Sequence, residues 1–464
     1  MTRPPDNGDA VNGDVSPARA AALATLRRLR GTTQRLDDSA RALPELSDLG
    51  RLDRALANEL VMGTIKRRAT LDAVLGRFTK APLETCDRDV RDVLRLAAYQ
   101  LLFLERVPSY AVVDDAVRMV APMGKRRGGF VNAVLRRTAA EGRAQLAVLG
   151  DGEGTRAWAV RLSYPPWLVA LLRRDLGDEA AQQLLMAGNA APERCLRVNR
   201  RLTDVAAARQ ALAAAGFVTS GVAGLPDALL YEGPPPLEAA APFRAGLVTP
   251  QSRGSQIVGV VAATGVAARG DAVLDLCAAP GAKTSQLAAL LPETRLTALE
   301  IDERRGDELR ANLARLGVSA VEVVRGDALE LPQEYAGAFA AVLLDAPCSG
   351  LGTLSSRADL RWRRRAADVP RLAALQRDLL ASAATAVAPG GTLTYAVCTV
   401  SRVETLDVVA SLLSRGGWEV DDLSPAWPRV THPAAGGYLL VLPPAGGSSG
   451  FFVARLRRCQ ERAR

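Results

Sequence analysis

Histidine is almost absent from this chain of 464 residues, which contains one, His432. A zinc or iron site built on two histidines therefore cannot form within one chain, and a Ser-His-Asp triad would have to use this residue. Cysteine is sparse too. The six cysteines are widely spaced and include no CxxC pair, so we expect neither a disulfide framework nor a bound metal. Catalysis is expected to depend on Cys, Asp, Glu or Lys side chains, or on a cofactor.

Long apolar runs are also missing. No stretch approaches the about 18 uninterrupted apolar residues of a membrane-spanning helix, and the N-terminal MTRPPDNGDAVNGDVSPARA lacks the apolar core of a signal peptide. We therefore expect a cytoplasmic protein with no membrane contact. Acidic residues number 50 against 59 basic ones, and the net charge of +9 favours a polyanion such as nucleic acid as the partner.

The chain is long enough for two or three domains of about 100–200 residues each. Residues 1–16, rich in Pro, Asn, Gly and Asp, predict a disordered tail. Over residues 17–145 apolar side chains recur at helical spacing, as in VRDVLRLAAYQLL, which predicts an all-α bundle. Residues 157–245 combine a strand-like CLRVNR with a helix-like TDVAAARQALAAAG, so we expect a small α/β module there.

Residues 246–464 show a different pattern, in which short apolar runs alternate with longer helical stretches. The candidate strands are AVLDLCA, RLTALEID, VEVVRGD, AFAAVLLDA, GTLTYAVC, WEVDDL and GFFVARL. Alternating β and α elements predict a parallel, doubly wound sheet that binds its ligand at the carboxyl ends of the strands.

The first of these strands leads into a candidate cofactor-binding turn, VLDLCAAPGAKTSQLAALL. Unpaired backbone N–H groups at the start of the helix would point at a ligand over the strand end, and Gly281 would permit its close approach. The motif is neither GxGxxG nor GxxxxGK[ST], which argues against the usual dinucleotide and nucleoside triphosphate sites. Taken alone, such a turn can equally be a tight connection.

Acidic residues follow the next two strands. Glu300 could accept hydrogen bonds from both ribose hydroxyls of an adenosine cofactor, and Asp327 could meet its adenine amino group. Asp302 could substitute for Glu300 or simply cap the helix that starts at Glu303. One acid at a strand end is as often structural as functional, but acids at successive strand ends indicate a nucleoside site.

Two cysteines follow the fourth and fifth strands: Cys348 in DAPC, shortly after Asp345, and Cys398 in TYAVC. A single cysteine on an apolar strand is most often a small buried hydrophobe. Two cysteines at strand ends that face one crevice favour reactive thiols instead. Cys277, within the turn, is expected to be structural or to line the cofactor site.

Basic residues concentrate in two segments. GKRRGGFVNAVLRRTAAEGR either forms a solvated helix face or contacts phosphates. The same alternatives apply to the arginine-rich segment after Cys348, where Trp362 could stack on a base or pack beneath the helix. The residues predicted to bind RNA are Lys125, Arg126, Arg127, Arg136, Arg137, Arg361, Trp362 and Arg363.

Two sets of sequence motifs resemble those of known families. SYAVVDDAVRMVAP followed by GGFVNAVLRR resembles the closing helices of the NusB-type RNA-binding domain. The cofactor turn, DAPC and the later strand cysteine together resemble the RNA 5-methylcytosine methyltransferases of the RsmB/Sun (Fmu) type, which use S-adenosylmethionine. The resemblance implies a NusB-like bundle over residues 17–145, a small RNA-binding module over 157–245, and a Rossmann-like class I methyltransferase domain over 246–464.

The resemblance also implies roles for single residues. Cys398 would be the nucleophile that adds to carbon 6 of cytosine, and Cys348 would be the base that aids product release. Asp345 would stabilise charge at ring N3, and Lys283 would lower a thiol pKa or contact the base. The S-adenosylmethionine site would comprise Cys277, Ala278, Ala279, Pro280, Gly281, Ala282, Lys283, Glu300, Asp327 and Asp345.

The implied reaction methylates carbon 5 of a cytosine in ribosomal RNA, in the small subunit, and we expect a monomer. The same chemistry on transfer RNA and a non-catalytic RNA-binding or antitermination-type factor are the alternatives. A DNA methyltransferase would take its nucleophile from Pro347-Cys348, and the additional Cys398 argues against it. Departures from the family pattern bear on target detail and rate rather than on reaction type; they are Ser252, Ala282, residues 355–358, Val397, Val403 and Thr405.

Overall fold

The computed structural model describes residues 15–31, 49–233, 236–266, 270–444, 447 and 449–460. Residues 1–14 of the predicted tail lie outside this set. The chain divides into two compact units, one bounded by Met1–Val169 with Arg357–Asp359, the other by Ala170–Ser356 with Leu360–Arg464. No helix among the described residues has the length and apolar character that crossing a membrane requires.

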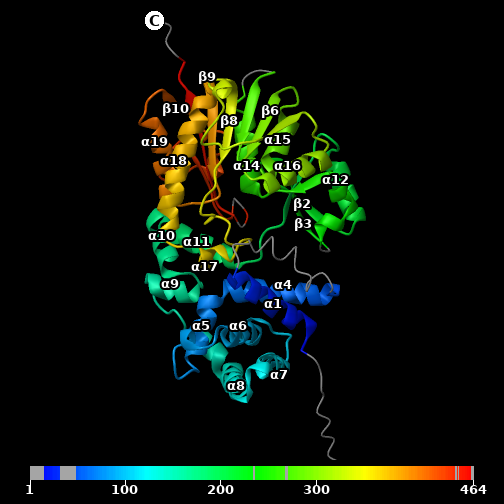
Figure 1. Cartoon of the computed structure of the whole chain (residues 1–464), viewed down its shortest axis with the longest axis vertical. Helices are drawn as coiled ribbons and strands as arrows, with labels where there is room; N and C mark the ends of the chain where they lie inside the picture. Colours follow the sequence, from blue (N-terminus) through cyan, green and yellow to red (C-terminus); the bar gives the residue numbers. More distant parts are fainter. Residues whose placement is uncertain are drawn as a thin grey trace, which may run out of the picture. The chain divides into compact units, whose positions relative to one another are not determined.

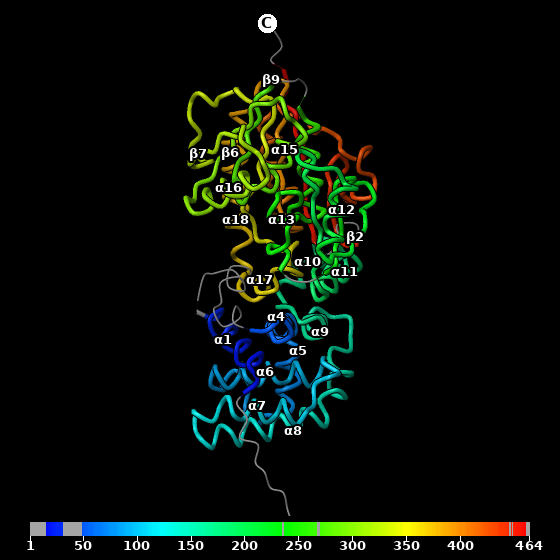
Figure 2. Tube along the Cα trace, turned by 90° about the vertical axis from the view of Figure 1, so that its right-hand side faces the viewer, coloured from blue at the N-terminus to red at the C-terminus, as the bar shows by residue number. Residues whose placement is uncertain are grey.

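The first unit consists of helices and their connections in the part that the structure describes (Figures 1 and 2). Leu94, Leu60 and Leu135 come from three helices and are fully buried in one core. The all-α prediction for this region is confirmed. The helices are α1 (Pro17–Gly31), α4 (Arg51–Lys66), α5 (Arg68–Gly76), α6 (Arg88–Phe103), α7 (Ser109–Val120), α8 (Lys125–Ala147) and α9 (Thr155–Arg161).

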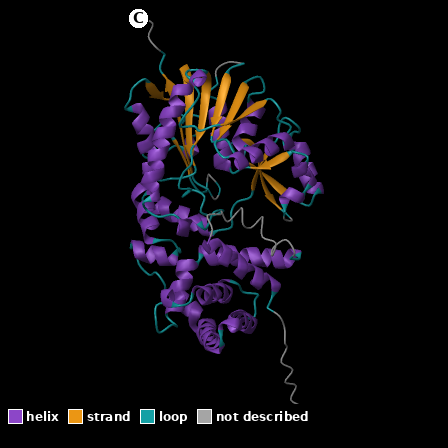
Figure 3. Ribbon diagram, viewed as in Figure 1, coloured by secondary structure: helices purple, strands orange, loops and turns teal. Residues whose placement is uncertain are grey.

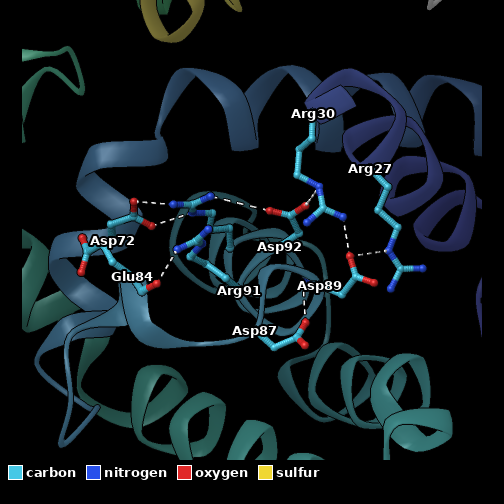
Figure 4. A network of polar contacts seen from close by, with 9 residues as sticks. Arg27, Arg30, Asp72, Glu84, Asp87, Asp89, Arg91 and Asp92 are labelled. Atoms are coloured by element: carbon cyan, nitrogen blue, oxygen red, sulfur yellow. Dashed lines mark hydrogen bonds and ion pairs between the residues drawn. The ribbon is translucent and has the colours of Figure 1, made fainter. Parts of the chain in front are cut away.

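Ion pairs tie α6 to α5 and α1 within this unit (Figure 4). The Arg95 guanidinium donates to both carboxylate oxygens of Asp72, at 2.6 and 2.7 Å, and Arg30 lies 3.0 Å from Asp92. Burial raises the pKa of Asp92, and the neighbouring arginines oppose that effect. Because these charges compensate one another inside the bundle, we assign them to helix packing rather than to RNA binding.

A four-stranded antiparallel sheet forms the small α/β module, in the order β2-β3-β1-β4. Leu196 and Leu212 are fully buried in its core, so the predicted strand CLRVNR and the predicted helix TDVAAARQALAAAG are confirmed. β4 lies past residue 245, so the sheet extends beyond the predicted limit of the module. The elements are α10 (Pro166–Leu176), α11 (Asp178–Asn189), β1 (Cys195–Val198), α12 (Val205–Ala214), β2 (Val218–Val222), β3 (Leu225–Glu232) and β4 (Val248–Pro250).

The larger sheet has eight strands in the order β10-β12-β9-β8-β5-β6-β7, with β11 beside β12, in the part of the chain that the structure describes. Figure 3 shows its strands in orange, with helices beside them. All seven predicted strands are present. The three-residue strand β11 was not predicted. The strands are β5 (Ala272–Leu276), β6 (Arg295–Glu300), β7 (Val321–Arg325), β8 (Phe339–Asp345), β9 (Val387–Val397), β10 (Trp418–Val420), β11 (Leu439–Val441) and β12 (Phe451–Arg458).

The doubly wound α/β fold is confirmed, but the sheet is mixed rather than wholly parallel. Strands β5 to β9 pair in parallel, whereas β12 pairs antiparallel with β9, β10 and β11. Parallel neighbours need a long crossover, usually a helix. The described chain from β10 to β12 holds the short 3-10 turn Pro428–Val430 and the strand β11 but no α-helix, so β12 returns antiparallel to β10.

Helices cover the larger sheet and position its carboxyl ends. Val258, Leu287 and Leu309, from three successive helices, share a core with Val273 and Leu343 of the sheet. From β5 the chain continues to β6 on one side, and from β8 it continues to β9 on the other side. The chain connections therefore run in opposite directions from the neighbouring strands β5 and β8, and ligands bind at this point in such folds. The helices are α14 (Arg253–Ala263), α15 (Ala282–Leu290), α16 (Glu303–Arg315), α17 (Leu360–Arg363), α18 (Asp368–Ala386) and α19 (Leu406–Leu413) (Figure 1).

Candidate active site

The turn between β5 and α15 has a backbone that its sequence requires. Gly281 has φ 96°, in the left-handed region that favours glycine, and it caps the N-terminus of α15. A Cβ atom at this position would lie 2.6 Å from Leu309 Cδ1, so space as well as conformation demands glycine. The unpaired N–H groups of the first turn of α15 therefore lie at the carboxyl end of β5, as the sequence predicts.

Side chains from α16 brace this turn from outside. Arg305 Nη2 donates to Ala279 O at 2.8 Å, and Asn312 Nδ2 donates to Pro280 O at 2.8 Å. Burial raises the pKa of Cys277, in the same turn, to about 12. A thiol with so high a pKa is a poor nucleophile, which agrees with the structural or cofactor-lining role predicted for Cys277.

Glu300 ends β6 and is 2% exposed. Its carboxylate accepts hydrogen bonds from Ala279 N at 3.3 Å and from Asp302 N at 3.2 Å, so it joins the turn to the next strand. Asp302 caps α16 by accepting from Arg305 N at 2.9 Å, which is the structural role considered for it.

Asp327 lies just beyond β7, half-buried, and accepts from Leu329 N at 2.9 Å. Two large apolar side chains next to the acids are exposed: Ile301 by 57% and Leu329 by 39%. Exposed aliphatic groups beside strand-end acids offer flat apolar contact for an aromatic base. The sequence interpretation singled out neither, although Ile301 directly follows Glu300 and Leu329 lies two residues after Asp327.

The other half of the crevice contains an ion pair. Lys283 Nζ, from the first turn of α15, lies 2.7 Å from Asp345 Oδ2 at the end of β8. The side chains are 11% and 30% exposed, and the ring of Phe451 lies 5.6 Å from the ammonium. The sequence left two roles open for Lys283, lowering the pKa of a thiol or contacting the cytosine base. In the structure its ammonium contacts the Asp345 carboxylate instead.

The two predicted reactive cysteines meet. Cys348 Sγ and Cys398 Sγ are 3.3 Å apart, and both residues are partly buried. The hydrogen bond to Cys398 and burial hold the pKa of Cys348 well above that of an ordinary thiol. Such a thiol holds its proton, which makes Cys348 a poor nucleophile; once deprotonated, its thiolate has a high affinity for a proton.

Comparison with known proteins follows the same division of the chain. Residues 266–457 match the family model of 16S rRNA methyltransferase RsmB/F, residues 16–140 that of the NusB family, and residues 164–238 that of the ferredoxin-like domain of RsmF/B-like methyltransferases. Ribosomal RNA small subunit methyltransferase B of Vibrio cholerae serotype O1 is 34% identical over 407 residues, 87% of this chain and 90% of that protein. The chain belongs to the RsmB/F family of 16S rRNA methyltransferases.

Solved structures agree with this family in fold. The crystal structure of PH0851 is 23% identical, has a TM-score of 0.81, and covers 96% of this chain and 99% of that one. The structure of NSun6 from Pyrococcus horikoshii with SFG is 20% identical, with a TM-score of 0.58, over 64% of this chain and 99% of that one. The resemblance drawn from FVNAVLR, the cofactor turn and DAPC is confirmed.

The predicted RNA-binding residues of this RsmB/F-family chain fall into two classes. Those of α8 are exposed: Lys125, Arg126 and Arg127 in its first turn, then Arg136 and Arg137. The first three line a groove of about 670 Å³ together with Phe130 and Asp87. A contact of these residues with RNA stays a prediction.

Arg361 does not fit the RNA-binding prediction. It is fully buried, and its guanidinium donates to Asn189 Oδ1 at 2.7 Å, Gly188 O at 2.9 Å and Leu354 O at 3.1 Å. These bonds hold α11 to the loop before α17, so Arg361 is a structural residue here. Trp362 is half-buried and Arg363 is exposed.

Some departures from the family pattern have structural explanations. Ser252 caps α14, where its side chain accepts from Ser255 N at 3.3 Å, a role that Asp would serve equally. Val397 is fully buried in β9, and Thr405 donates to Ser401 O at 2.8 Å. Nothing in the structure explains Val403.

Proposed function

We propose that this chain transfers a methyl group from S-adenosylmethionine to carbon 5 of a cytosine in small-subunit ribosomal RNA, through a covalent bond between Cys398 and carbon 6. The observation that carries the proposal is the pair of thiols 3.3 Å apart, on the sheet edge that also bears the Lys283–Asp345 ion pair. The name of the Vibrio cholerae relative supports ribosomal RNA as substrate, and SFG, an analogue of S-adenosylmethionine, in the NSun6 structure supports the cofactor.

The residues of the crevice fit S-adenosylmethionine. Gly281 begins α15, whose first-turn N–H groups lie at the carboxyl end of β5 and would face the ligand. Glu300 Oε1 accepts from Asp302 N and from Arg305 Nη1, whereas Oε2 accepts from Ala279 N and keeps a lone pair for a ribose hydroxyl. Asp327 would accept from the adenine amino group, with Ile301 and Leu329 as apolar contacts. When bound, the cofactor supplies an electrophilic methyl group on its sulfonium sulfur.

Cys398 begins the reaction. Carbon 5 of cytosine is a weak nucleophile, but addition of the Cys398 thiolate to carbon 6 turns the ring into an enamine whose carbon 5 can take up a methyl group. A proton passed from the Lys283 ammonium to the Asp345 carboxylate would let Asp345 donate a hydrogen bond to ring N3, which stabilises the negative charge that develops there in this step.

Cys348 completes the reaction. After methylation carbon 5 still carries its hydrogen, and the bond to Cys398 breaks only when that proton leaves. Cys348 first gives up its own thiol proton to solvent. The resulting thiolate takes the carbon 5 proton, and the electron pair of the C5–H bond forms the C5=C6 double bond and expels the Cys398 thiolate. The sulfur-to-sulfur distance of 3.3 Å supports the two thiols acting on adjacent ring carbons.

The target cytosine must be unpaired or flipped, because carbon 6 is buried in a stacked duplex. We propose the exposed basic residues of α8, together with Arg363, as contacts to phosphates of the surrounding RNA, and the half-buried Trp362 as a surface for a base. Contacts to phosphates orient the RNA and contribute affinity, and the residues around the two cysteines select the base.

The test uses purified chain, tritiated-methyl donor and small-subunit RNA, with transfer RNA and duplex DNA in parallel reactions. We expect label in the ribosomal RNA at carbon 5 of one cytosine, and none with Cys398→Ala. Cys348→Ala should accumulate a protein–RNA adduct that survives a denaturing gel. Undiminished methylation by Cys398→Ala would overturn the mechanism, preferential labelling of transfer RNA or DNA would overturn the substrate, and absence of donor binding would favour a non-catalytic RNA-binding factor.

A further inference from the structure

Glu404 is a fully buried carboxylate that has no part in the reaction described above. It ends the short 3-10 turn Arg402–Glu404, which follows the Cys398 segment. A carboxylate is tolerated in a protein interior only when hydrogen bonds replace its hydration. The partners of Glu404 therefore reveal which parts of the chain it organises.

The Glu404 carboxylate accepts hydrogen bonds from the residues that follow the two cysteines in the sequence. Its Oε1 accepts from Ser349 N at 2.8 Å and from Gln376 Nε2 at 3.1 Å, and its Oε2 accepts from the Ser349 hydroxyl and from Thr399 Oγ1 at 3.1 Å. Ser349 follows Cys348 and Thr399 follows Cys398 in the sequence. The Glu404 side chain thus joins the two cysteine segments, beside the direct contact of the Ser349 and Thr399 hydroxyls at 2.9 Å.

The Cys398 segment has other support. Cys398 directly follows β9, where Val397 pairs with Phe452 of β12. Its carbonyl oxygen accepts from Gly352 N at 3.0 Å. A Cβ at Gly352 would lie 2.0 Å from Gly450 O, which shows how closely the chain packs here. The strand β9 therefore holds Cys398 on one side, and the Gly352 bond joins it to the loop that carries Cys348.

The Cys348 segment depends on side chains instead. It lies beyond the end of β8 in a loop, where Gln376 Nε2 donates to Pro347 O at 2.9 Å and Arg364 Nη2 donates to Cys348 O at 3.2 Å. Ser349 adds further attachments: its N–H and hydroxyl both bond to Glu404, and its carbonyl oxygen accepts from Arg364 Nε at 3.0 Å. Backbone bonds to the Cys398 segment flank this loop at Ala346 and Gly352. Since Ser349 directly follows Cys348 and gives Glu404 two of its bonds, we expect loss of the Glu404 carboxylate to displace Cys348 more than Cys398.

We propose that Glu404 is a positioning residue for product release, which holds Cys348 against the carbon 5 proton while Cys398 is bonded to carbon 6. This inference rests on the function proposed above. The charge of Glu404 also contributes, after the hydrogen bond to Cys398 and burial, to the raised pKa of Cys348, and so to the proton affinity that a base needs.

The test is Glu404→Gln in the full chain, because an amide of the same shape replaces one acceptor oxygen by a donor and cannot satisfy all four bonds. We expect the Cys398 adduct to form within about twofold of the wild-type rate. Its breakdown should slow about tenfold or more, so that adduct accumulates on a denaturing gel as for Cys348→Ala. KM for donor and RNA should change by less than about twofold, so the loss lies in kcat.

A matched control is Glu193→Gln, which removes a carboxylate paired with Arg253 in the same unit. It should accumulate no adduct. A merely structural role for Glu404 would lower adduct formation, donor affinity and melting temperature together, and that pattern, or wild-type breakdown of the adduct, would overturn the inference. If Glu404→Gln does not fold, Ser349→Ala decides: it should slow adduct breakdown in the same direction, and normal breakdown would overturn the inference.

The same experiment separates the two proposals. Absence of any Cys398-dependent adduct in the wild-type and Cys348→Ala proteins would overturn the proposed function itself. An adduct in Cys348→Ala with normal release in Glu404→Gln would overturn the role of Glu404 alone.

Discussion

Lys283 and Asp345 form an ion pair that joins the cofactor turn to the strand leading into the Cys348 segment, with Nζ 2.7 Å from Oδ2. The lysine is mostly buried, against the ring of Phe451. β5, which leads into α15, and β8 are neighbours in the sheet, so the pair bridges the point where the chain directions diverge. Breaking it should therefore disturb the chemistry of the base more than the fold of either half.

Lys283→Met should lower kcat for methylation by about 100-fold, because it removes the ammonium that stabilises charge and orients Asp345. The measurement is single-turnover methylation at saturating donor. Lys80→Met, which removes an exposed lysine of the helical unit, is the control and should retain wild-type kcat. Wild-type kcat in Lys283→Met would show that the ion pair has no role in the reaction.

Gly281→Ala tests the cofactor turn, and Gly337→Ala provides a matched control. Both glycines have positive φ, 96° and 63°, so alanine costs about 1 kcal/mol at each. A Cβ at Gly337 meets nothing within 4 Å, whereas one at Gly281 lies 2.6 Å from Leu309. We expect Gly281→Ala to lower the melting temperature more than Gly337→Ala does. We also expect Gly281→Ala to weaken the binding of the methyl donor, measured by calorimetry. Equal losses in the two variants would contradict the close packing described.

Sequence patterns predicted much of the fold because most elements carry local signals. The strands of the larger sheet are apolar runs between turns, and α6 repeats its apolar residues at helical spacing. The antiparallel return of β12 could not be predicted, since strand direction depends on the length and course of the connection rather than on the strand's own residues.

The sequence predicted those site residues that lie at the ends of strands. Glu300 ends β6, Cys348 and Cys398 follow β8 and β9, and parallel strands bring such positions to one edge of the sheet. Glu404 lacked this signal, because its importance comes from burial and from partners distant in the sequence. Arg361 misled for the same reason: its charge is visible in the sequence, but its burial is not.

Arg361→Ala and Arg363→Ala should separate structure from RNA binding. Arg361→Ala leaves Asn189 Oδ1 and two buried carbonyl groups without their donor, which should lower the free energy of unfolding by about 2–4 kcal/mol with little effect on RNA affinity. Arg363→Ala should leave stability unchanged, weaken RNA binding, and reduce the slope of log affinity against log salt by about 1. Urea unfolding and filter binding at several salt concentrations measure both. The opposite pattern would restore Arg361 as an RNA contact.

Asp275, on β5, should make stability depend on pH. It is 1% exposed, and burial raises its pKa to about 7 although Thr284 Oγ1 donates to it at 2.7 Å. In the unfolded chain its pKa is about 3.9. Between these values the folded protein binds a proton that the unfolded chain does not, so stability falls as the pH rises from about 4 to about 7, and the loss is complete above about 7.

Asp275→Asn has no such proton, and its side-chain oxygen can still accept from Thr284. The free energy of unfolding of the variant minus that of the wild type should therefore increase from pH 5 to pH 8, by about 1–3 kcal/mol, in urea titrations. Asp307→Asn, at a side chain 72% exposed on α16, is the control, and its difference should stay nearly constant with pH. A constant difference for Asp275→Asn would mean that the buried carboxyl stays ionised across this range, and that the polar groups around β5 solvate its charge.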